Sequence, residues 1–292
     1  QWRELDSNSG PASFAVRQSG GLECEWSNGR LAVNDSASKD QVGIVVRVLP
    51  NAADYWSRYA DYYSVDGTEK LGCDTADPSG PCSIDSLFKD TWVEVAAWGL
   101  DGNGGQSVRA AAMRRIADSV RRSVAAADAN ASTWSPPPGT IPVAAHRCDE
   151  FFSSTDVTAA LNLTGELYLS GMDGGESLIG SAWIEANARP CPWATPDGLG
   201  ISGGLRVLPG GEWAWKITRA ADSAGYATVA IPGLAPEDGA YMRCSPVGYC
   251  TVEIVLGHNW IQIYLDQGAD RVGPTRSALL TLAAKTVSSV RT

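Results

Sequence analysis

Ser202 is the residue of this chain whose surroundings most resemble a catalytic site. The segment Gly200–Gly204 matches G-x-S-x-G, and Asp238 and His258 follow it in the Ser, Asp, His order of α/β-hydrolases. A nucleophile elbow ends a parallel strand and opens a helix, whereas Leu205–Leu208 has the composition of a strand itself. We therefore interpret the segment as a loop and keep a secreted serine hydrolase as an alternative only.

Residues that could bind a metal are few and badly spaced. The chain has two histidines, His146 and His258, and neither lies at a zinc-ligand spacing from the cysteines. The stretch Asp101–Gly105 resembles a calcium loop but lacks the alternating carboxylates and the distal glutamate of such loops. It is more typical of a turn before a helix near Ser107. We expect no metal and no cofactor.

Aromatic side chains gather in the segment Asp54–Tyr63. If this segment is helical, four tyrosines share one face: Tyr55, Tyr59, Tyr62 and Tyr63. An aromatic face with carboxylates nearby suits a sugar or the hot spot of a protein interface. The alternative is that part of the cluster packs in the core, because Trp56 within it aligns with Trp215 later in the chain.

A second candidate binding face carries four arginines on a predicted helix: Arg114, Arg115, Arg121 and Arg122. They lie opposite an apolar stripe that includes Met113 and Val120, and the corresponding later helix has only Lys285 and small polar residues. Guanidinium groups on one face could bind a carboxylate-rich partner or an anionic wall polymer. The alternative is a solvated face whose arginines pair with local acids.

Both faces belong to the first of two copies of one sequence pattern. The motif Cys24-Glu25-Trp26, the motif Arg47-Val48-Leu49-Pro50, two cysteines and a tryptophan recur in the same order. The members of the second copy are Cys191-Pro192-Trp193, Arg206-Val207-Leu208-Pro209, Cys244, Cys250 and Trp260. A repeat of this length predicts two globular domains rather than solenoid units. We place them at residues 1–130 and 143–292, joined by a proline-rich linker at 131–142.

Each copy combines strands with helices. Residues rich in β-branched and aromatic side chains predict strands at Val42–Leu49, Trp92–Trp98, Leu205–Leu208 and Trp260–Leu265. Each copy ends in an amphipathic helix, and Ser153–Asp156 would cap a short helix at the start of the second copy that leads into strands near Leu178–Glu185. The predicted fold class is α+β, with two similar tandem domains, each an antiparallel sheet covered by helices.

The seven cysteines predict a disulfide framework of an extracytoplasmic protein. Within the repeat, Cys73 pairs with Cys82 and Cys244 with Cys250, which leaves Cys148 for Cys191. The same spacing would put a partner for Cys24 before Gln1. We therefore expect that the first domain lacks its opening helix here, with a buried, unbridged Cys24 as the alternative.

Charge and hydropathy exclude two further classes. The formal net charge is -10 and basic residues form no runs, which argues against binding to nucleic acid. No apolar stretch approaches the ~18 residues of a membrane span. Any contact with a membrane would therefore be through an anchor encoded upstream.

The second copy resembles a known group of proteins. It has an opening cysteine with an acidic helix, Cys148-Asp149-Glu150-Phe151 and then Asp156-Val157, followed by Cys191-Pro192-Trp193 and a strand-rich body. This pattern is similar to that of small secreted lipoproteins of actinobacteria whose function is mostly unassigned, and which share a fold with the extrinsic oxygen-evolving protein of photosystem II. The resemblance implies an anchored, non-enzymatic protein of the cell envelope and supplies no catalytic residues.

The sequence thus predicts a non-enzymatic, extracytoplasmic binding or interaction module, secreted or in the bacterial cell envelope. Its partner would be an envelope protein or a cell-wall component. Besides the hydrolase, the alternative is the sensor ectodomain of a membrane-anchored protein.

Overall fold

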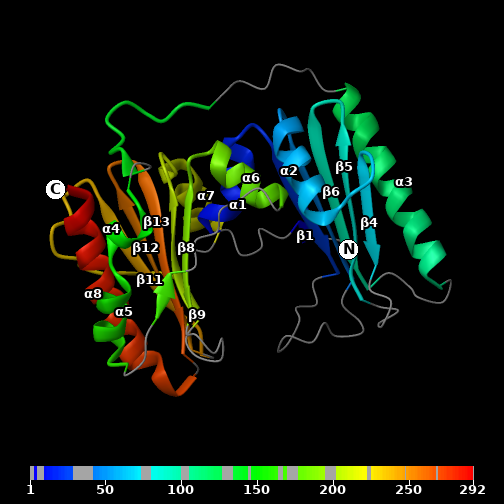
Figure 1. Ribbon diagram of the computed structural model, residues 1–292. Coiled ribbons are helices and arrows are strands. Elements are labelled where there is room, and N and C mark those ends of the chain that lie inside the picture. The colour runs from blue at the N-terminus through cyan, green and yellow to red at the C-terminus, as the bar shows by residue number, and fades with distance from the viewer. Residues whose placement is uncertain are drawn as a thin grey trace. The chain divides into compact units, whose positions relative to one another are not determined.

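The computed structural model describes residues 3–4, 10–28, 42–73, 80–99, 105–126, 134–143, 146–163, 167–169, 177–194, 202–221, 225–246, 248–267 and 269–291. Within these residues the protein is mixed α+β and contains two antiparallel sheets (Figure 1). The chain divides into two compact units. Unit 1 comprises Gln1–Asn8, Val16–Trp134 and Gly174–Ala182, and unit 2 comprises Ser9–Ala15, Ser135–Asp173 and Trp183–Thr292.

The sheet of unit 1 has the strand order β1-β2-β3-β6-β5-β4. The strands are β1 (Arg3–Glu4), β2 (Leu22–Ser27), β3 (Gly43–Leu49), β4 (Glu69–Cys73), β5 (Cys82–Phe88) and β6 (Thr91–Trp98). Because consecutive side chains of a strand point to opposite faces, this sheet has two different surfaces to cover. Helix α3 (Gly105–Ala126) covers one and α2 (Ala53–Tyr63) the other, as Figure 1 shows.

Each face of this sheet has its own core. On the α3 face, branched side chains such as Val93 and Val95 pack against Met113 of the helix, all fully buried. On the α2 face, Trp92 packs edge-to-face against Trp56, with 5.4 Å between the ring centroids. The α2 face therefore holds the larger aromatic side chains, and it is the face on which the polar residues described below also lie.

The sheet of unit 2 has the order β10-β11-β12-β13-β9-β8-β7. The strands are β7 (Tyr168–Leu169), β8 (Arg189–Ala194), β9 (Ser202–Leu208), β10 (Ala227–Thr228), β11 (Gly239–Cys244), β12 (Tyr249–Leu256) and β13 (Asn259–Asp266). The helical elements are α4 (Cys148–Phe151), α5 (Ser154–Leu161), α7 (Glu212–Ala221), the 3-10 turn η3 (Ala269–Arg271) and α8 (Val272–Arg291). Helices α4, α5 and α8 lie on one side of the sheet and α7 on the other (Figure 1).

The five strands β2-β3-β6-β5-β4 correspond in order to β8-β9-β13-β12-β11. The register agrees as well, because Trp92 pairs with Leu49 in unit 1 and Trp260 pairs with Leu208 in unit 2. The helix after the second strand of each set places a buried tryptophan against the sheet tryptophan. Repeated sequence positions therefore occupy equivalent places.

One expected strand is wrong: Leu178–Glu185 forms the helix α6. Its buried residues include Leu178, Ser181 and Ala182, which are spaced by three and four residues and so share one helical face. In chain order the equivalent helix is α1 (Pro11–Gln18), which precedes β2 just as α6 precedes β8, and the division between the units falls within each of these helices. Thus a helix does lie ahead of Cys24, whereas α4 and α5 have no counterpart among the described residues of unit 1.

Three disulfides are present and match the pairs expected from the repeat. Cys73–Cys82 joins the neighbouring strands β4 and β5, and Cys244–Cys250 joins β11 and β12. Cys148–Cys191 ties α4 to β8, and Cys24 belongs to none of the three. Such bridges are compatible with an extracellular protein. No helix in the described ranges has both the length and the hydropathy of a membrane span.

Candidate binding surface

Tyr59, the central residue of the predicted tyrosine face, is buried and supports the structure around it. Its hydroxyl donates a hydrogen bond of 3.0 Å to Asp85, and the indole Nε1 of Trp92 donates to the other oxygen of the same carboxylate at 3.1 Å. Desolvation is the main cause that raises the pKa of both Tyr59 and Asp85. This tyrosine therefore supports the alternative that part of the cluster packs in the core.

A row of charged residues crosses the same face of the sheet, with one member on each of five strands. The register aligns them in the order Glu23, Arg47, Glu94, Asp85 and Lys70. Arg47 donates to Glu23 at 2.6 Å from Nε and to Glu94 at 2.7 Å from Nη1. Burial raises the pKa of Glu94, although the charge of Arg47 opposes this. Arg47 thus joins Glu23 and Glu94 in one ion-pair network within the row.

Lys70, at the end of this row, connects the buried network to exposed aromatic rings. Its Nζ lies 3.3 Å from the centroid of Tyr63 and 5.1 Å from that of Tyr59. Tyr63 in turn contacts Tyr59 and Tyr62, each at a centroid distance of 4.8 Å. Tyr62 is 61% exposed and Tyr63 is 43% exposed. We call Tyr62, Tyr63 and Lys70 the tyrosine surface.

The last turn of α2 holds the two exposed tyrosines in place. Ser64 adopts the left-handed conformation, with φ 52°, and ends the helix. The next backbone N–H, that of Val65, donates to Ala60 O at 2.8 Å and so satisfies a carbonyl of the final turn. Tyr55, the fourth predicted tyrosine, is half-buried and packs against the core of this face.

The four arginines of α3 divide into two pairs. Arg114 and Arg121 both contact Glu69 of β4, at 3.2 Å and 2.9 Å, and Arg121 also pairs with Asp118. Burial raises the pKa of Glu69, but hydrogen bonds from these two arginines outweigh it and lower that pKa. The other pair, Arg115 and Arg122, is exposed and contacts no acid in the described part of the chain. Local pairing therefore accounts for half of this cluster.

Sequence reasoning missed the two residues that link these faces. Glu69 and Lys70 are neighbours on β4, the edge strand, and neighbours on a strand point to opposite faces. Glu69 accordingly reaches the arginines of α3, and Lys70 reaches the tyrosines of α2. A pair of opposite charges just ahead of Cys73 was the available signal, but it acquires meaning only from the strand pairing.

The three residues of the possible hydrolase triad do not converge. Ser202 pairs with Asp266 at one end of β9, whereas Leu208 at its other end pairs with Trp260, two residues after His258. Six residues of strand separate these ends, which is about 20 Å. His258 Nδ1 instead lies 2.6 Å from Glu212 Oε2.

The Asp238 carboxylate binds a backbone N–H group and an arginine, and His258 is not its partner. Its Oδ1 accepts a hydrogen bond from Gly257 N at 2.9 Å, and Oδ2 pairs with Arg291. Because the serine is at the opposite end of the strand, this geometry gives no nucleophile–base pair.

Metal-binding groups are also dispersed. No three histidine, cysteine or carboxylate side chains come together in the described ranges. His146 lies 3.7 Å from Glu150 and against the ring of Phe151, so its surroundings are those of a helix start. The possible calcium loop at residues 101–104 lies outside the described residues, and α3 begins directly after it at Gly105.

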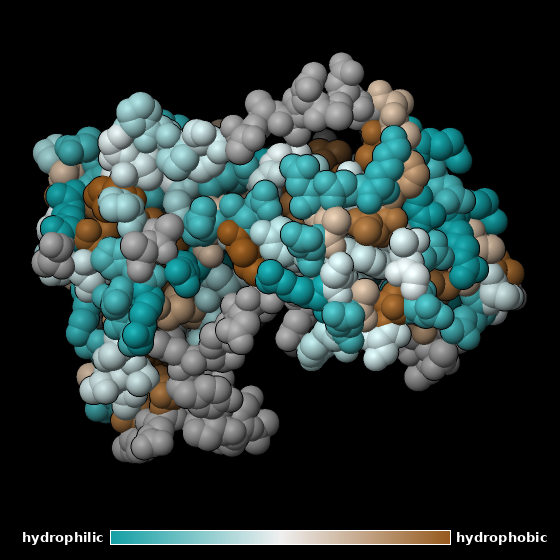
Figure 2. Space-filling model, turned by 45° about the horizontal axis from the view of Figure 1, so that its top comes forward, coloured by the Kyte–Doolittle hydropathy of each residue, from teal (hydrophilic) through white to brown (hydrophobic). Residues whose placement is uncertain are grey.

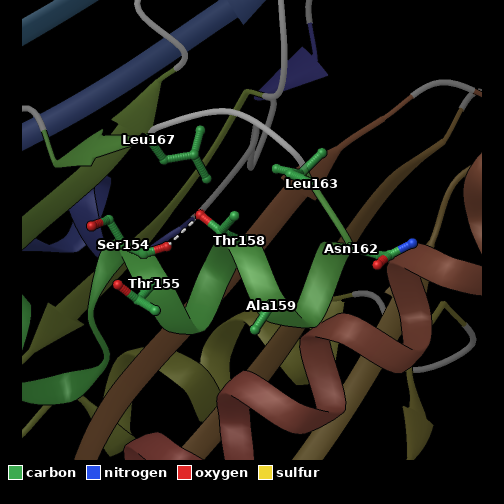
Figure 3. A pocket seen from close by; sticks show the side chains of 7 residues that line it. All are labelled: Ser154, Thr155, Thr158, Ala159, Asn162, Leu163 and Leu167. Carbon is green, nitrogen blue, oxygen red and sulfur yellow. Dashed lines mark hydrogen bonds between the residues drawn. The ribbon is translucent and has the colours of Figure 1, made fainter.

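A shallow pocket of about 480 Å³ lies along α5 in unit 2 (Figure 3). The polar side chains of Ser154, Thr155, Thr158 and Asn162 line it, together with Leu163 and Leu167. Thr158 already donates its hydroxyl to Ser154 O at 2.8 Å. None of the residues that line the pocket is charged, and none of them was predicted from the sequence to bind a ligand.

Large hydrophobic side chains are scarce on the surface. Those that are exposed in the described ranges are Leu22, Tyr62, Tyr63, Val108, Ile184 and Ile217. On the face drawn in Figure 2, hydrophobic residues form small separate areas among hydrophilic ones. Tyr62 and Tyr63 are the pair in this set whose rings touch, which makes their position the strongest candidate for a binding contact.

Comparison with known proteins found no matching family model, no matching curated protein and no matching solved structure.

Proposed function

We propose that this chain is a non-enzymatic, extracytoplasmic binding module of a bacterial cell envelope, built from two tandem copies of one α+β domain. It binds an envelope protein or a cell-wall component through the tyrosine surface of unit 1. Its relationship to the secreted lipoproteins of actinobacteria is part of the same proposal. The three disulfides and the repeated strand order support the location and the duplication.

The observation that carries the binding role is the exposure of Tyr62 and Tyr63 on a rigid base. Two touching aromatic rings are exposed on a helix end, while Tyr59 beneath them is fixed by the buried Asp85. Rigid aromatic side chains lose little conformational entropy when they are covered, so they are typical anchors of interfaces. The cation of Lys70 adds an attraction for acidic or hydroxylated groups at the same place.

The surface is also a difference between the two units. The helix α7 of unit 2 places Ala221 where α2 has Tyr62, when Trp56 and Trp215 are aligned. If folding of the domain required an aromatic residue at this helix position, we would expect one in unit 2 as well, where Ala221 lies instead. The aromatic pair is therefore better explained by binding than by folding.

The test is co-sedimentation of the purified two-unit protein with insoluble cell-wall material and, separately, capture of proteins from an envelope extract. The variant Tyr62→Ser/Tyr63→Ser should lose about tenfold or more in affinity for the true partner, in line with the loss of two aromatic anchors. Thermal unfolding of this variant should match that of the wild type, because neither ring is buried.

The matched control is Ile217→Ser on α7, whose side chain is 43% exposed, as is that of Tyr63. This variant should bind as the wild type does. Equal binding by all three proteins would exclude the tyrosine surface as the binding site. Absence of binding to either material would exclude the proposed partner classes.

A further inference from the structure

Arg206 of unit 2 and Arg47 of unit 1 occupy the same position in the two sheets, but only Arg47 is neutralised. Arg47 pairs across the sheet with Glu23 on one side and Glu94 on the other. Arg206 pairs in the same way with Pro190 and Gln262. Both carboxylates of unit 1 are thus replaced by uncharged residues in unit 2.

The contacts of Arg206 show what remains available on its guanidinium. Nη1 donates to Gln262 Oε1 at 3.0 Å, and no carboxylate in the described part of the chain pairs with it. The amide of Gln262 is held in this orientation because its Nε2 donates to the buried Glu253 at 2.9 Å. The planar group lies over the ring of Tyr264, with Cζ 4.3 Å from the centroid. Its other N–H groups make no hydrogen bond within the described residues, and the side chain is partly exposed. Gly10 lies beside this group, where a Cβ would come within 3.3 Å of Nη1.

Two tyrosines lie near this guanidinium on the same face of the sheet. Tyr264 lies directly over Gly204, where a Cβ would come within 2.6 Å of the phenol oxygen. Tyr249 of β12 stacks beside Tyr264 at a centroid distance of 6.2 Å. Burial raises the pKa of Tyr249, while the positive charges of Arg206 and Arg243 both act to lower it. The strand register places Arg206, Tyr249 and Arg243 on the same face of the sheet.

In the described ranges, no ion pair joins Arg206 to a carboxylate. Glu253 is fully buried and already accepts hydrogen bonds from Trp260 and Gln262. A partly buried guanidinium beside no carboxylate is costly, and an anionic ligand removes that cost while forming charge-assisted hydrogen bonds.

We propose that Arg206, together with the hydroxyl groups of Tyr249 and Tyr264, forms an anion-binding site on the α7 face of unit 2, for a ligand that bears a carboxylate or a phosphate group. Arg206, its neighbours Pro190 and Gln262, and the two tyrosines lie on the paired strands β8, β9, β12 and β13, so the site is preorganised. This site goes beyond the proposed function, because it lies in the other unit and shares no residue with the tyrosine surface.

The experiment is isothermal titration of the intact two-unit protein with inorganic phosphate, with glucuronate and with uncharged glucose. Binding of phosphate, of glucuronate or of both supports the site and identifies which anion it takes. Failure of both anions to bind, or equal binding of glucose, would overturn it. These outcomes do not depend on whether Tyr62 and Tyr63 bind a partner.

A pair of variants at Pro190 separates charge from fold. Pro190→Glu restores the carboxylate that Glu23 supplies to Arg47, and should weaken binding of the anion tenfold or more, in keeping with neutralisation by a neighbouring acid. Pro190→Gln has nearly the same shape without the charge and should bind as the wild type does. Equal affinity in the two variants would contradict the role of Arg206, and Arg206→Gln should abolish binding altogether.

Discussion

Asp85 and Glu253 are structural equivalents: each is a buried carboxylate that accepts a hydrogen bond from the indole of a tryptophan seven residues further along the chain. The tryptophans are Trp92 and Trp260, and in both units the acid and the tryptophan lie on the helix-covered face formed with α2 or α7. In each unit this hydrogen bond from the indole to the buried acid fixes the position of a large aromatic ring.

Stability should depend on pH through Glu253. Desolvation raises the pKa of this buried carboxyl above its ordinary value, so the folded protein holds the proton more tightly than the unfolded chain does. The resulting stabilisation is complete below the unfolded pKa, about 4.3, and is lost as pH rises through the folded value. Chemical unfolding should therefore show Glu253→Gln gaining stability relative to the wild type from pH 4 to pH 7.

Removal of the hydroxyl of Tyr59 should destabilise unit 1. Tyr59→Phe leaves one oxygen of the buried Asp85 without its donor, which costs about 1–3 kcal/mol. Tyr62→Phe, at a ring that is 61% exposed, should change stability by less than about 0.5 kcal/mol. Urea unfolding followed by tryptophan fluorescence measures both, and equal midpoints would show that the Tyr59–Asp85 bond contributes nothing.

The two equivalent arginines should respond differently to substitution. Arg47→Leu would leave Glu23 and Glu94 without their shared cation in a largely buried row, at a cost of about 3–5 kcal/mol. Arg206→Leu removes one hydrogen bond to a neutral amide and the contact with the ring of Tyr264, and should cost about 1–2 kcal/mol. Comparable losses in the two variants would mean that Arg206 has an acidic partner after all.

The disulfide Cys148–Cys191 should contribute more to the free energy of unfolding than Cys73–Cys82 does. Cys148–Cys191 spans a sequence separation of 43, and the chain-entropy relation gives about 4 kcal/mol for a loop of that length. Cys73–Cys82 spans 9 and gives about 3 kcal/mol by the same relation. Paired Cys→Ser variants compared in thermal unfolding check this order. Non-reducing peptide mapping checks the pairing, and a Cys24–Cys191 peptide would contradict it.

Elements with a strong period were predictable from the sequence. The stripe of Met113 and Val120 on α3 and the strand before Leu49 lie where the sequence placed them. The helix at Leu178–Glu185 was not predictable in this way, because a short apolar run fits the pattern of a strand and that of a buried helix equally well. Only the packing of the finished fold decides between them.

The functional surfaces depended on the strand register, which the sequence does not reveal. Tyr62 and Tyr63 were recognisable as a cluster, but Lys70 joins them only because β4 pairs with β5 opposite Asp85. The isolation of Arg206 is similarly invisible until Pro190 and Gln262 are known to be its neighbours. A change of one residue in register would move each of these side chains to the other face.

Glu69 and Lys70 are adjacent residues of β4, and their side chains contact opposite faces of the sheet. The disulfide at Cys73 fastens one end of β4 to β5, and these two residues lie at the other end of the strand. A partner that contacted Lys70 would act on the same stretch of backbone that positions Glu69 against Arg114 and Arg121. The α2 and α3 faces of unit 1 are therefore linked through adjacent residues of one strand.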